Sequence, residues 1–192
     1  VRTCSMSRHV IRSTLLCAAL LASTAALGKV EVQAVQPKNA GPILAVSITE
    51  TIAPGDYESL FKGLLANPGK YTKKLALLDN IGGSVAEAIR MGRLLRESGF
   101  DTLVQDNAVC QGSCVYLLAA GHVKTVRGHV GIHRPYFANG DSALAANTTR
   151  HNPTAYFQEM RIPASLLTDM QAIDPRNVRV LTPKELARYR LN

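Results

Sequence analysis

The sequence predicts an α/β fold in which helices flank a mainly parallel sheet, and two observations lead to it. Short apolar runs, rich in β-branched residues, alternate with longer segments in which apolar residues recur every three or four positions. Such alternation is typical of parallel strands joined by right-handed helical crossovers. Apolar residues also make up 46% of the 192 residues, which is enough for one domain with a sizeable core.

The elements follow one another most clearly in the first two thirds of the chain. Residues 75–79 (LALLD) form a short apolar run, as in a strand that is buried on both faces. Ser84 and Glu87 form an S-x-x-E capping box, so a helix is expected to begin there and to end near Gly99. A second capping box at residues 182–185 (TPKE) predicts a short last helix. The other predicted elements are strands at 43–52, 102–104, 123–126 and 130–133 and helices at 56–66 and 113–120.

The chain is expected to consist of a leader and one domain. Arg8 and Arg12 precede the apolar run Leu15 to Leu27, which is the pattern of a secretory signal peptide at residues 1–28. The run is too short for a membrane span, so none is expected after cleavage; an uncleaved anchor is the alternative. The protein is therefore expected in a bacterial periplasm or outside the cell. Residues 29–41 are expected to form a flexible lead and residues 42–192 a single domain, with an arm or lid at 136–176.

The formal net charge of +8 does not by itself indicate a nucleic-acid-binding protein. Three of the positive charges lie in the expected signal peptide. Aromatic residues make up 5% of the chain, and lysine and arginine form no run, so the usual pattern of a nucleic-acid-binding surface is missing. A solvated basic surface is the better explanation.

Four cysteines are present, and Cys4 and Cys17 lie in the expected signal peptide. The other two, Cys110 and Cys114, would then meet an oxidising compartment, where a disulfide is the expected state. If both lie on one helical turn, their Cα atoms are about 6 Å apart, which is within the range of a disulfide. A zinc site that adds a histidine, and two buried cysteines that simply pack, are the alternatives.

Three short segments carry residues suited to catalysis. Gly82 and Gly83 join a buried strand to a helix, where backbone N–H groups can hold a developing oxyanion; a tight turn is the alternative. Ser113 opens an apolar helix, where a serine is either a nucleophile or an N-cap. His133 ends a predicted strand and can act as a general base if it meets the serine in space, with His129 as its rival on the same strand face.

From about residue 43 to residue 135 the chain resembles the proteolytic subunit of the Clp protease and the wider ClpP/crotonase fold family. Residues 80–83 (NIGG) stand where the family has Ser-Pro-Gly-Gly. Residues 111–114 (QGSC), followed by 117–121 (LLAAG), resemble the helix that carries the nucleophile, and residues 132–135 (IHRP) resemble an Ile-His-Gln-Pro strand. Residues 181–186 (LTPKEL), with Tyr189 and Leu191, resemble the family's closing segment.

The resemblance implies a spiral of ββα units and a serine peptidase that acts on peptides or proteins without a cofactor or metal ion. Ser113 would be the nucleophile and His133 the general base. Gly82, Gly83 and the N–H of Cys114 would bind the oxyanion. The resemblance also implies self-association into a homo-oligomer. The signal peptide and the paired cysteines are similar to those of exported bacterial ClpP-like proteins.

Departures from the family pattern leave other interpretations open. Asn80 and Ile81 replace Ser-Pro, and Val178 stands near the position of the family's catalytic acid. Asp174 is the nearest replacement for that acid and Asp169 a weaker one, while a backbone carbonyl or a water molecule would also orient the histidine.

A catalytically inactive binding or scaffold protein with the same fold is therefore the main alternative to the peptidase. A crotonase-like acyl-CoA enzyme is a third hypothesis, which the sequence disfavours because no carboxylate pair stands out. A Ser/Lys peptidase is a variant of the first hypothesis and would use Lys73, Lys74 or Lys124 as its base.

Overall fold

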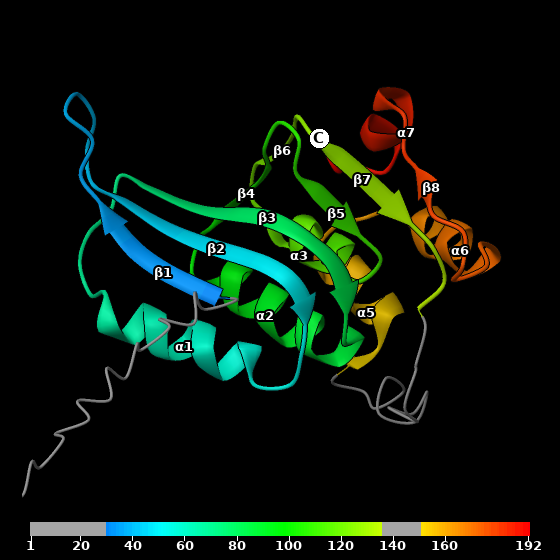
Figure 1. The fold of residues 1–192 in the computed structure, drawn as a ribbon, viewed down its shortest axis with the longest axis horizontal. Coiled ribbons are helices and arrows are strands. Elements are labelled where there is room, and N and C mark those ends of the chain that lie inside the picture. Colours follow the sequence, from blue (N-terminus) through cyan, green and yellow to red (C-terminus); the bar gives the residue numbers. More distant parts are fainter. Residues whose placement is uncertain (1–29, 136–150) are drawn as a thin grey trace, which may run out of the picture.

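The computed structural model describes residues 30–135 and 151–192 as an α/β fold (Figure 1). Its strands are β1 (Val30–Val35), β2 (Ile43–Ile52), β3 (Lys73–Gly83), β4 (Asp101–Val104), β5 (Val109–Gln111), β6 (Lys124–Val126), β7 (His129–Ile132) and β8 (Arg179–Val180). Its helices are α1 (Asp56–Ala66), α2 (Val85–Glu97), α3 (Cys114–Ala120), α5 (Pro153–Glu159), α6 (Ala164–Ala172) and α7 (Pro183–Arg188).

The eight strands form one branched sheet, with the order β1-β2-β3-β5-β7-β8 along its longer path. The branch lies in β3: residues 75–77 pair with β4, whereas Asn80 pairs with Cys110 of β5. Strand β6 extends the first branch, and β7 and β8 extend the second. The pairs β1–β2 and β7–β8 are antiparallel and the other pairs are parallel. The mainly parallel sheet predicted from the sequence is therefore confirmed.

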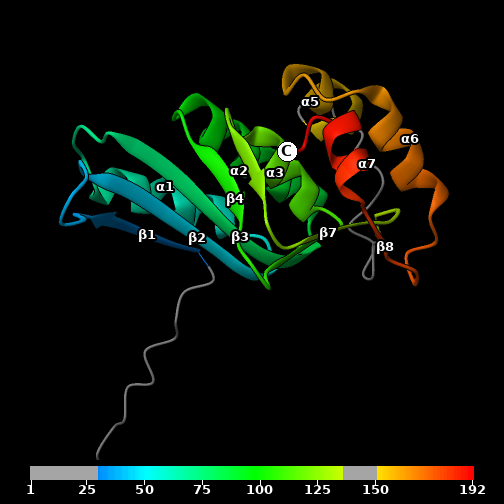
Figure 2. The same ribbon diagram turned by 90° about the horizontal axis from the view of Figure 1, so that it is seen from above.

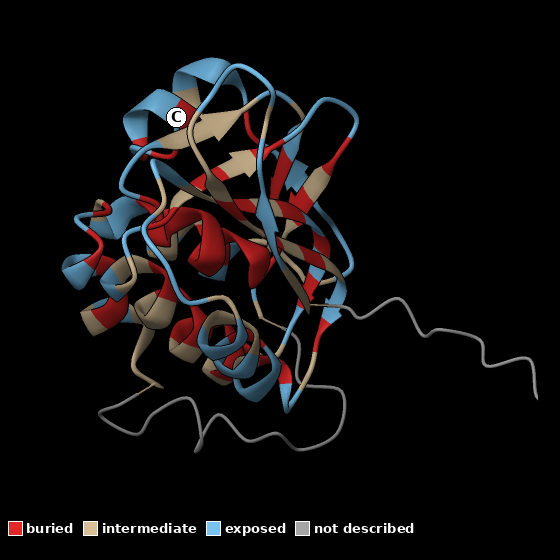
Figure 3. Ribbon diagram, turned by 90° about the vertical axis from the view of Figure 1, so that its left-hand side faces the viewer, coloured by how far each residue is buried: buried red, intermediate tan, exposed pale blue. Residues whose placement is uncertain are grey.

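Helix α3 lies buried at the centre of the described structure, between the sheet and the other helices. Helices α1 and α2 cover one face of the sheet, and α6 and α7 lie near β8 (Figure 2). Every residue of α3 is buried, and Figure 3 shows this helix enclosed by the elements around it. Among the described residues, no helix has the length and apolar character needed to cross a membrane.

Strand β1 corrects the prediction of a flexible lead at residues 29–41. It pairs with β2 in an antiparallel register that runs from Val30 opposite Ile48 to Val35 opposite Ile43. Val30 and Val32 alternate with polar residues and pack against the core, which is the signature of a strand with one covered face. The Pro, Asn and Gly residues that follow obscured this short signal in the sequence.

Helix α5, which lies in the predicted arm or lid, packs into the core. Tyr156 and Phe157 are buried, and the Tyr156 hydroxyl donates to the Tyr116 carbonyl of α3 at 2.7 Å. The rings of Tyr116 and Phe157 stack with their centroids 4.6 Å apart. Residues 136–150 of the predicted arm, like the expected signal peptide, lie outside the described residues.

The two predicted capping boxes form to different extents. At the start of α7 the box closes in both directions. At the start of α2 the Ser84 hydroxyl accepts from the Glu87 N–H, but the Glu87 carboxylate accepts from the N–H groups of Gly55 and Tyr57 instead. This buried carboxylate therefore ties the beginning of α1 to α2, a contact between residues about thirty positions apart.

We expect Tyr156→Ala to lower the free energy of unfolding by about 3 to 5 kcal/mol, because a buried aromatic ring and its hydrogen bond are lost. Urea denaturation of the two proteins measures the difference. Gln158→Ala changes an exposed residue of the same helix and is expected to stay within about 0.5 kcal/mol. Equal midpoints for Tyr156→Ala and wild type would mean that α5 is not part of the cooperative core.

Candidate active site

Ser113 lies in the turn between β5 and α3 and does not cap the helix with its side chain. Gly112, with φ +55°, turns the chain so that Ser113 lies only 5% exposed at the start of α3. The Ser113 hydroxyl donates a hydrogen bond of 2.9 Å to the Gly83 carbonyl at the end of β3. The interpretation of Ser113 as an ordinary N-cap therefore does not describe this serine.

The glycine pair at the end of β3 permits a close approach of two backbones. Gly82 and Gly83 have φ values of +91° and +138°, where residues with a side chain are strained. A Cβ atom on Gly82 would lie 2.9 Å from the Ser113 nitrogen, and one on Gly83 would lie 2.1 Å from the Ile52 carbonyl oxygen. A side chain on Gly82 would push the Ser113 turn away from β3, and one on Gly83 would push β3 away from Ile52 of β2.

His133 follows β7 and is oriented by the backbone. Its Nδ1 lies 2.9 Å from the Arg134 carbonyl oxygen. Because a carbonyl oxygen only accepts hydrogen bonds, Nδ1 carries a proton, and in the neutral ring Nε2 is then an acceptor. A Cβ atom on Gly112 would lie 2.7 Å from Nε2, so this acceptor faces the turn that carries Ser113.

These groups share one pocket with a volume of about 430 Å³. Ser113, His133, Gly82 and Gly83, all predicted from the sequence, line it. Cys114 follows Ser113 as the first residue of α3, so its N–H has no acceptor within the helix. The remaining lining residues, which sequence reasoning missed, are Thr51, Ile81, Val85, Pro135, Pro175 and Arg176. Ile81 and Val85 lie close to the glycine pair in the sequence, so their place in the pocket could have been predicted. Nothing in the sequence around Thr51 or Arg176 indicates that these residues line a pocket.

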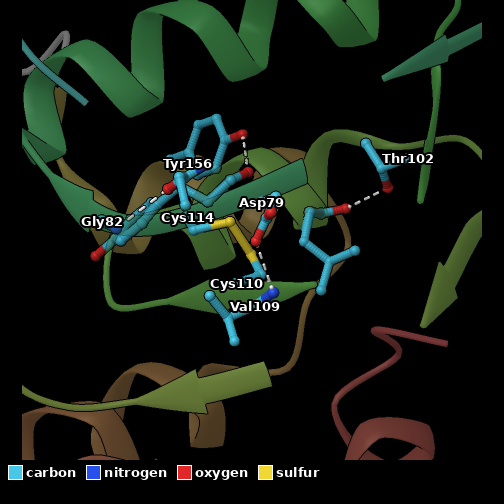
Figure 4. The surroundings of a disulfide bond; sticks show 10 residues. Asp79, Gly82, Thr102, Val109, Cys110, Cys114 and Tyr156 are labelled. Carbon is cyan, nitrogen blue, oxygen red and sulfur yellow. Dashed lines mark hydrogen bonds between the residues drawn. A yellow bond between two sulfur atoms is a disulfide. The ribbon is translucent and has the colours of Figure 1, made fainter. Parts of the chain in front are cut away.

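A disulfide joins Cys110 of β5 to Cys114 of α3, with the two Cα atoms 5.2 Å apart (Figure 4). It encloses Gly112 and Ser113 and links the serine turn to the sheet. Both cysteines are fully buried. A disulfide that closes so short a loop is expected to stabilise the fold by about 2 kcal/mol, because it lowers the conformational entropy of the unfolded chain. With the sulfur atoms joined to each other, neither is a thiolate ligand for zinc in this structure.

Comparison with solved structures identifies the architecture. The catalytic domain of the ClpP protease from Plasmodium falciparum superposes with a TM-score of 0.56 at 16% sequence identity, over 78% of this chain and 81% of that one. The chain has a ClpP-like fold. A mutant of the 1510-N membrane-bound stomatin-specific protease superposes with a TM-score of 0.55 at 18% identity, over 77% of this chain and 74% of that one. No protein-family model and no curated protein sequence matches the chain.

Within the ClpP-like fold, Asp174 does not take the place of the acid that orients the histidine. Its carboxylate accepts from the backbone N–H, Nε and Nη2 of Arg176, at 2.9, 3.0 and 2.9 Å. These hydrogen bonds lower the pKa of Asp174 to about 2. Asp169 is engaged in a different place, with Arg188 and Tyr189. The Arg134 carbonyl is therefore the group that orients His133.

Other candidate bases of the sequence lie elsewhere. His129 is exposed on β7, and the Nε2 of His122 lies 3.0 Å from the Arg96 carbonyl oxygen. Lys74 donates to the Ser98 carbonyl at 2.9 Å. In the described part of the chain, neither a lysine nor a carboxylate lines the pocket. The geometry thus gives no support to the Ser/Lys variant or to a carboxylate-based site.

We expect the Asp174 carboxyl group to titrate near pH 2 and to return towards its ordinary value of 3.8 in Arg176→Ala. The pKa is lowered in the folded protein, so the pair stabilises the fold above the ordinary pKa, and that contribution is lost as the pH falls towards 2. Carbon NMR of the carboxyl group measures both values. An unchanged pKa in Arg176→Ala would show that another group holds Asp174.

Proposed function

We propose that the protein is a serine hydrolase of the peptidase type, with Ser113 as nucleophile and His133 as general base. One observation carries the proposal: Ser113 and His133 line the same pocket, with Nε2 of the histidine facing the serine turn. A nucleophile beside a base whose other nitrogen is held by a third group is the arrangement of activated serines. The solved structures with the same fold include two proteins named as proteases.

The reaction begins with a rotation of the serine side chain. The Ser113 hydroxyl leaves the Gly83 carbonyl and donates to Nε2 of His133, which takes the proton as the oxygen attacks a peptide carbonyl carbon. The oxyanion is stabilised by the backbone N–H groups of Gly83 and Cys114, since the Gly82 N–H is bound by Asn80. His133 then passes the proton to the leaving amine, and water hydrolyses the acyl-enzyme.

The walls of the pocket suggest which peptides would bind. Ile81, Val85, Pro135 and Pro175 give it a largely apolar lining, and the Arg176 side chain stands at its border with 87% of its surface exposed. We propose that a substrate places an apolar side chain in this pocket beside the scissile bond. Self-association into a homo-oligomer, which the family resemblance implies, stays a prediction.

A catalytically inactive binding protein is the second candidate, and two observations favour it. The Ser113 hydroxyl donates to Gly83 rather than to His133, and the orienting group is a neutral carbonyl rather than a carboxylate. A carbonyl stabilises the imidazolium less than a carboxylate does. In this second function the pocket would hold a peptide segment without cleaving it.

Labelling with a fluorophosphonate probe tests the proposal, because the probe phosphonylates an activated serine and releases fluoride. We expect the folded wild type to be labelled, Ser113→Ala to lose labelling, and His133→Ala to react about 10² to 10⁴ times more slowly. His129→Ala, which removes an exposed histidine of β7 that does not line the pocket, serves as the matched control and keeps the wild-type rate. A folded wild type that resists the probe supports the binding protein instead.

We also propose that the protein is exported to the periplasm or out of the cell. The apolar run at residues 15–27 and the buried Cys110–Cys114 pair support this, because stable disulfides belong to oxidising compartments.

In protein alkylated in denaturant as the cells are lysed, so that the buried positions are accessible, we expect Cys110 and Cys114 to carry no alkyl group, because their sulfur atoms are bonded to each other. After reduction each is expected to carry one. Peptide mass spectrometry measures both states. In the control variant Cys110→Ser, Cys114 has no partner and is expected to be alkylated without reduction, which shows that a free thiol in this peptide is detected. Two alkyl groups without reduction would contradict both the disulfide and export.

A further inference from the structure

Asn80 is a buried polar side chain next to the pocket that the mechanism above does not use. It is 1% exposed and lies in β3, three residues before the end of the strand. Its backbone is aligned with Glu50 of β2 on one side and with Cys110 of β5 on the other. The sheet therefore holds the position of this residue from both sides.

The side chain of Asn80 holds the backbone of the glycine pair. Its Oδ1 accepts a hydrogen bond of 3.1 Å from the N–H of Gly82, a contact within buried surroundings. A side-chain amide that binds the backbone two residues further along is an Asx turn, which fixes the peptide it binds. Gly82 is the residue packed against the nitrogen of Ser113, so Asn80 sets how this peptide meets the serine turn.

The next residue, Gly83, carries this orientation to the nucleophile. It is aligned with Ile52, and the N–H of Ser84 donates to the Ile52 carbonyl at 2.9 Å. In a parallel ladder, Ile52 bonds to the neighbours of the residue opposite it. The N–H and the carbonyl of Gly83 itself therefore point away from β2. The Gly83 carbonyl indeed accepts from the Ser113 hydroxyl. A change in the Gly82 peptide would therefore turn the polar groups of Gly83 relative to Ser113.

The Nδ2 atom of Asn80 indicates that a contribution to the stability of the fold does not by itself explain why asparagine is found here. Its Nδ2 is buried and has no hydrogen-bond partner among the described residues. An unpaired buried amide is unfavourable, and a smaller side chain would avoid the penalty. The feature that asparagine supplies here is a strong acceptor for the Gly82 N–H.

We propose that Asn80 is a positioning residue of the Ser113 site. By holding the Gly82 N–H, it presents the N–H of Gly83 to the oxyanion that forms when Ser113 attacks. Asn80 touches no reacting atom, since it does not line the pocket. The inference rests on the proposed hydrolase function. Serine at this position would accept a weaker hydrogen bond from the Gly82 N–H, and alanine or leucine would accept none.

The experiment compares Asn80→Ser, Asn80→Ala and Asn80→Leu with wild type in the full chain, using the fluorophosphonate probe. The maximal labelling rate is expected to fall by about 10² for alanine and leucine, as when an oxyanion donor is lost, and by less for serine. The probe concentration at half-maximal rate stays the same, because binding before the reaction does not use the oxyanion. Hydrogen exchange of the Gly82 amide is expected to be slow in wild type and Asn80→Ser and fast in the other two.

The outcomes separate the two proposals. If wild type is labelled through Ser113 and Asn80→Ala reacts at the same rate, the role of Asn80 is wrong and the hydrolase stands. If wild type is not labelled, the hydrolase is wrong and the role of Asn80 in it is overturned too, whatever the amide exchange shows. If the alanine and leucine proteins do not fold, Asn80→Ser decides: a lower rate with an unchanged melting temperature supports the role, and the wild-type rate refutes it.

Discussion

The bridge between Asn80 of β3 and Cys110 of β5 is the contact on which the candidate site depends. Strand β3 pairs with β4 through Leu77 and then turns to β5, so the sheet divides at this point. The second branch brings the end of β5 against the glycine pair, and the disulfide holds the following turn to the same strand. That bridge, together with the hydrogen bond from the Ser113 hydroxyl to the Gly83 carbonyl, sets the place of Ser113 relative to the glycine pair.

The parallel pairing of β5 with β7 brings His133 to the Ser113 turn. Gln111 is aligned with Gly131, so the segments that follow the two strands leave the sheet at the same edge. Ser113 and His133 are thus neighbours because of topology, although twenty residues separate them. Val178 packs against Gly131, where a Cβ would lie 2.4 Å from its Cγ1, and the Arg134 carbonyl orients the ring of His133.

Elements with strong local signals were predictable, and elements that depend on partners were not. The continuous apolar run of β3 and the capping boxes of α2 and α7 show in the sequence, because their patterns arise within a few neighbouring residues. Strands β5 and β8, with three and two residues, have no periodicity of their own and exist because neighbouring strands bind them. Helix α5 escaped prediction for the same reason, since its aromatic residues are stabilised by α3.

The sequence by itself determined the α/β class and the residue types suited to catalysis at Ser113, His133 and the glycine pair. These follow from the order of apolar runs and from motifs that each span a few residues. Only the tertiary structure decided which of them meet, that Asp174 binds Arg176, and that the side chain of Asn80 holds the Gly82 peptide. The physical reason is that a hydrogen bond forms according to distance and direction in space, which the folded backbone sets and the order of residues leaves open.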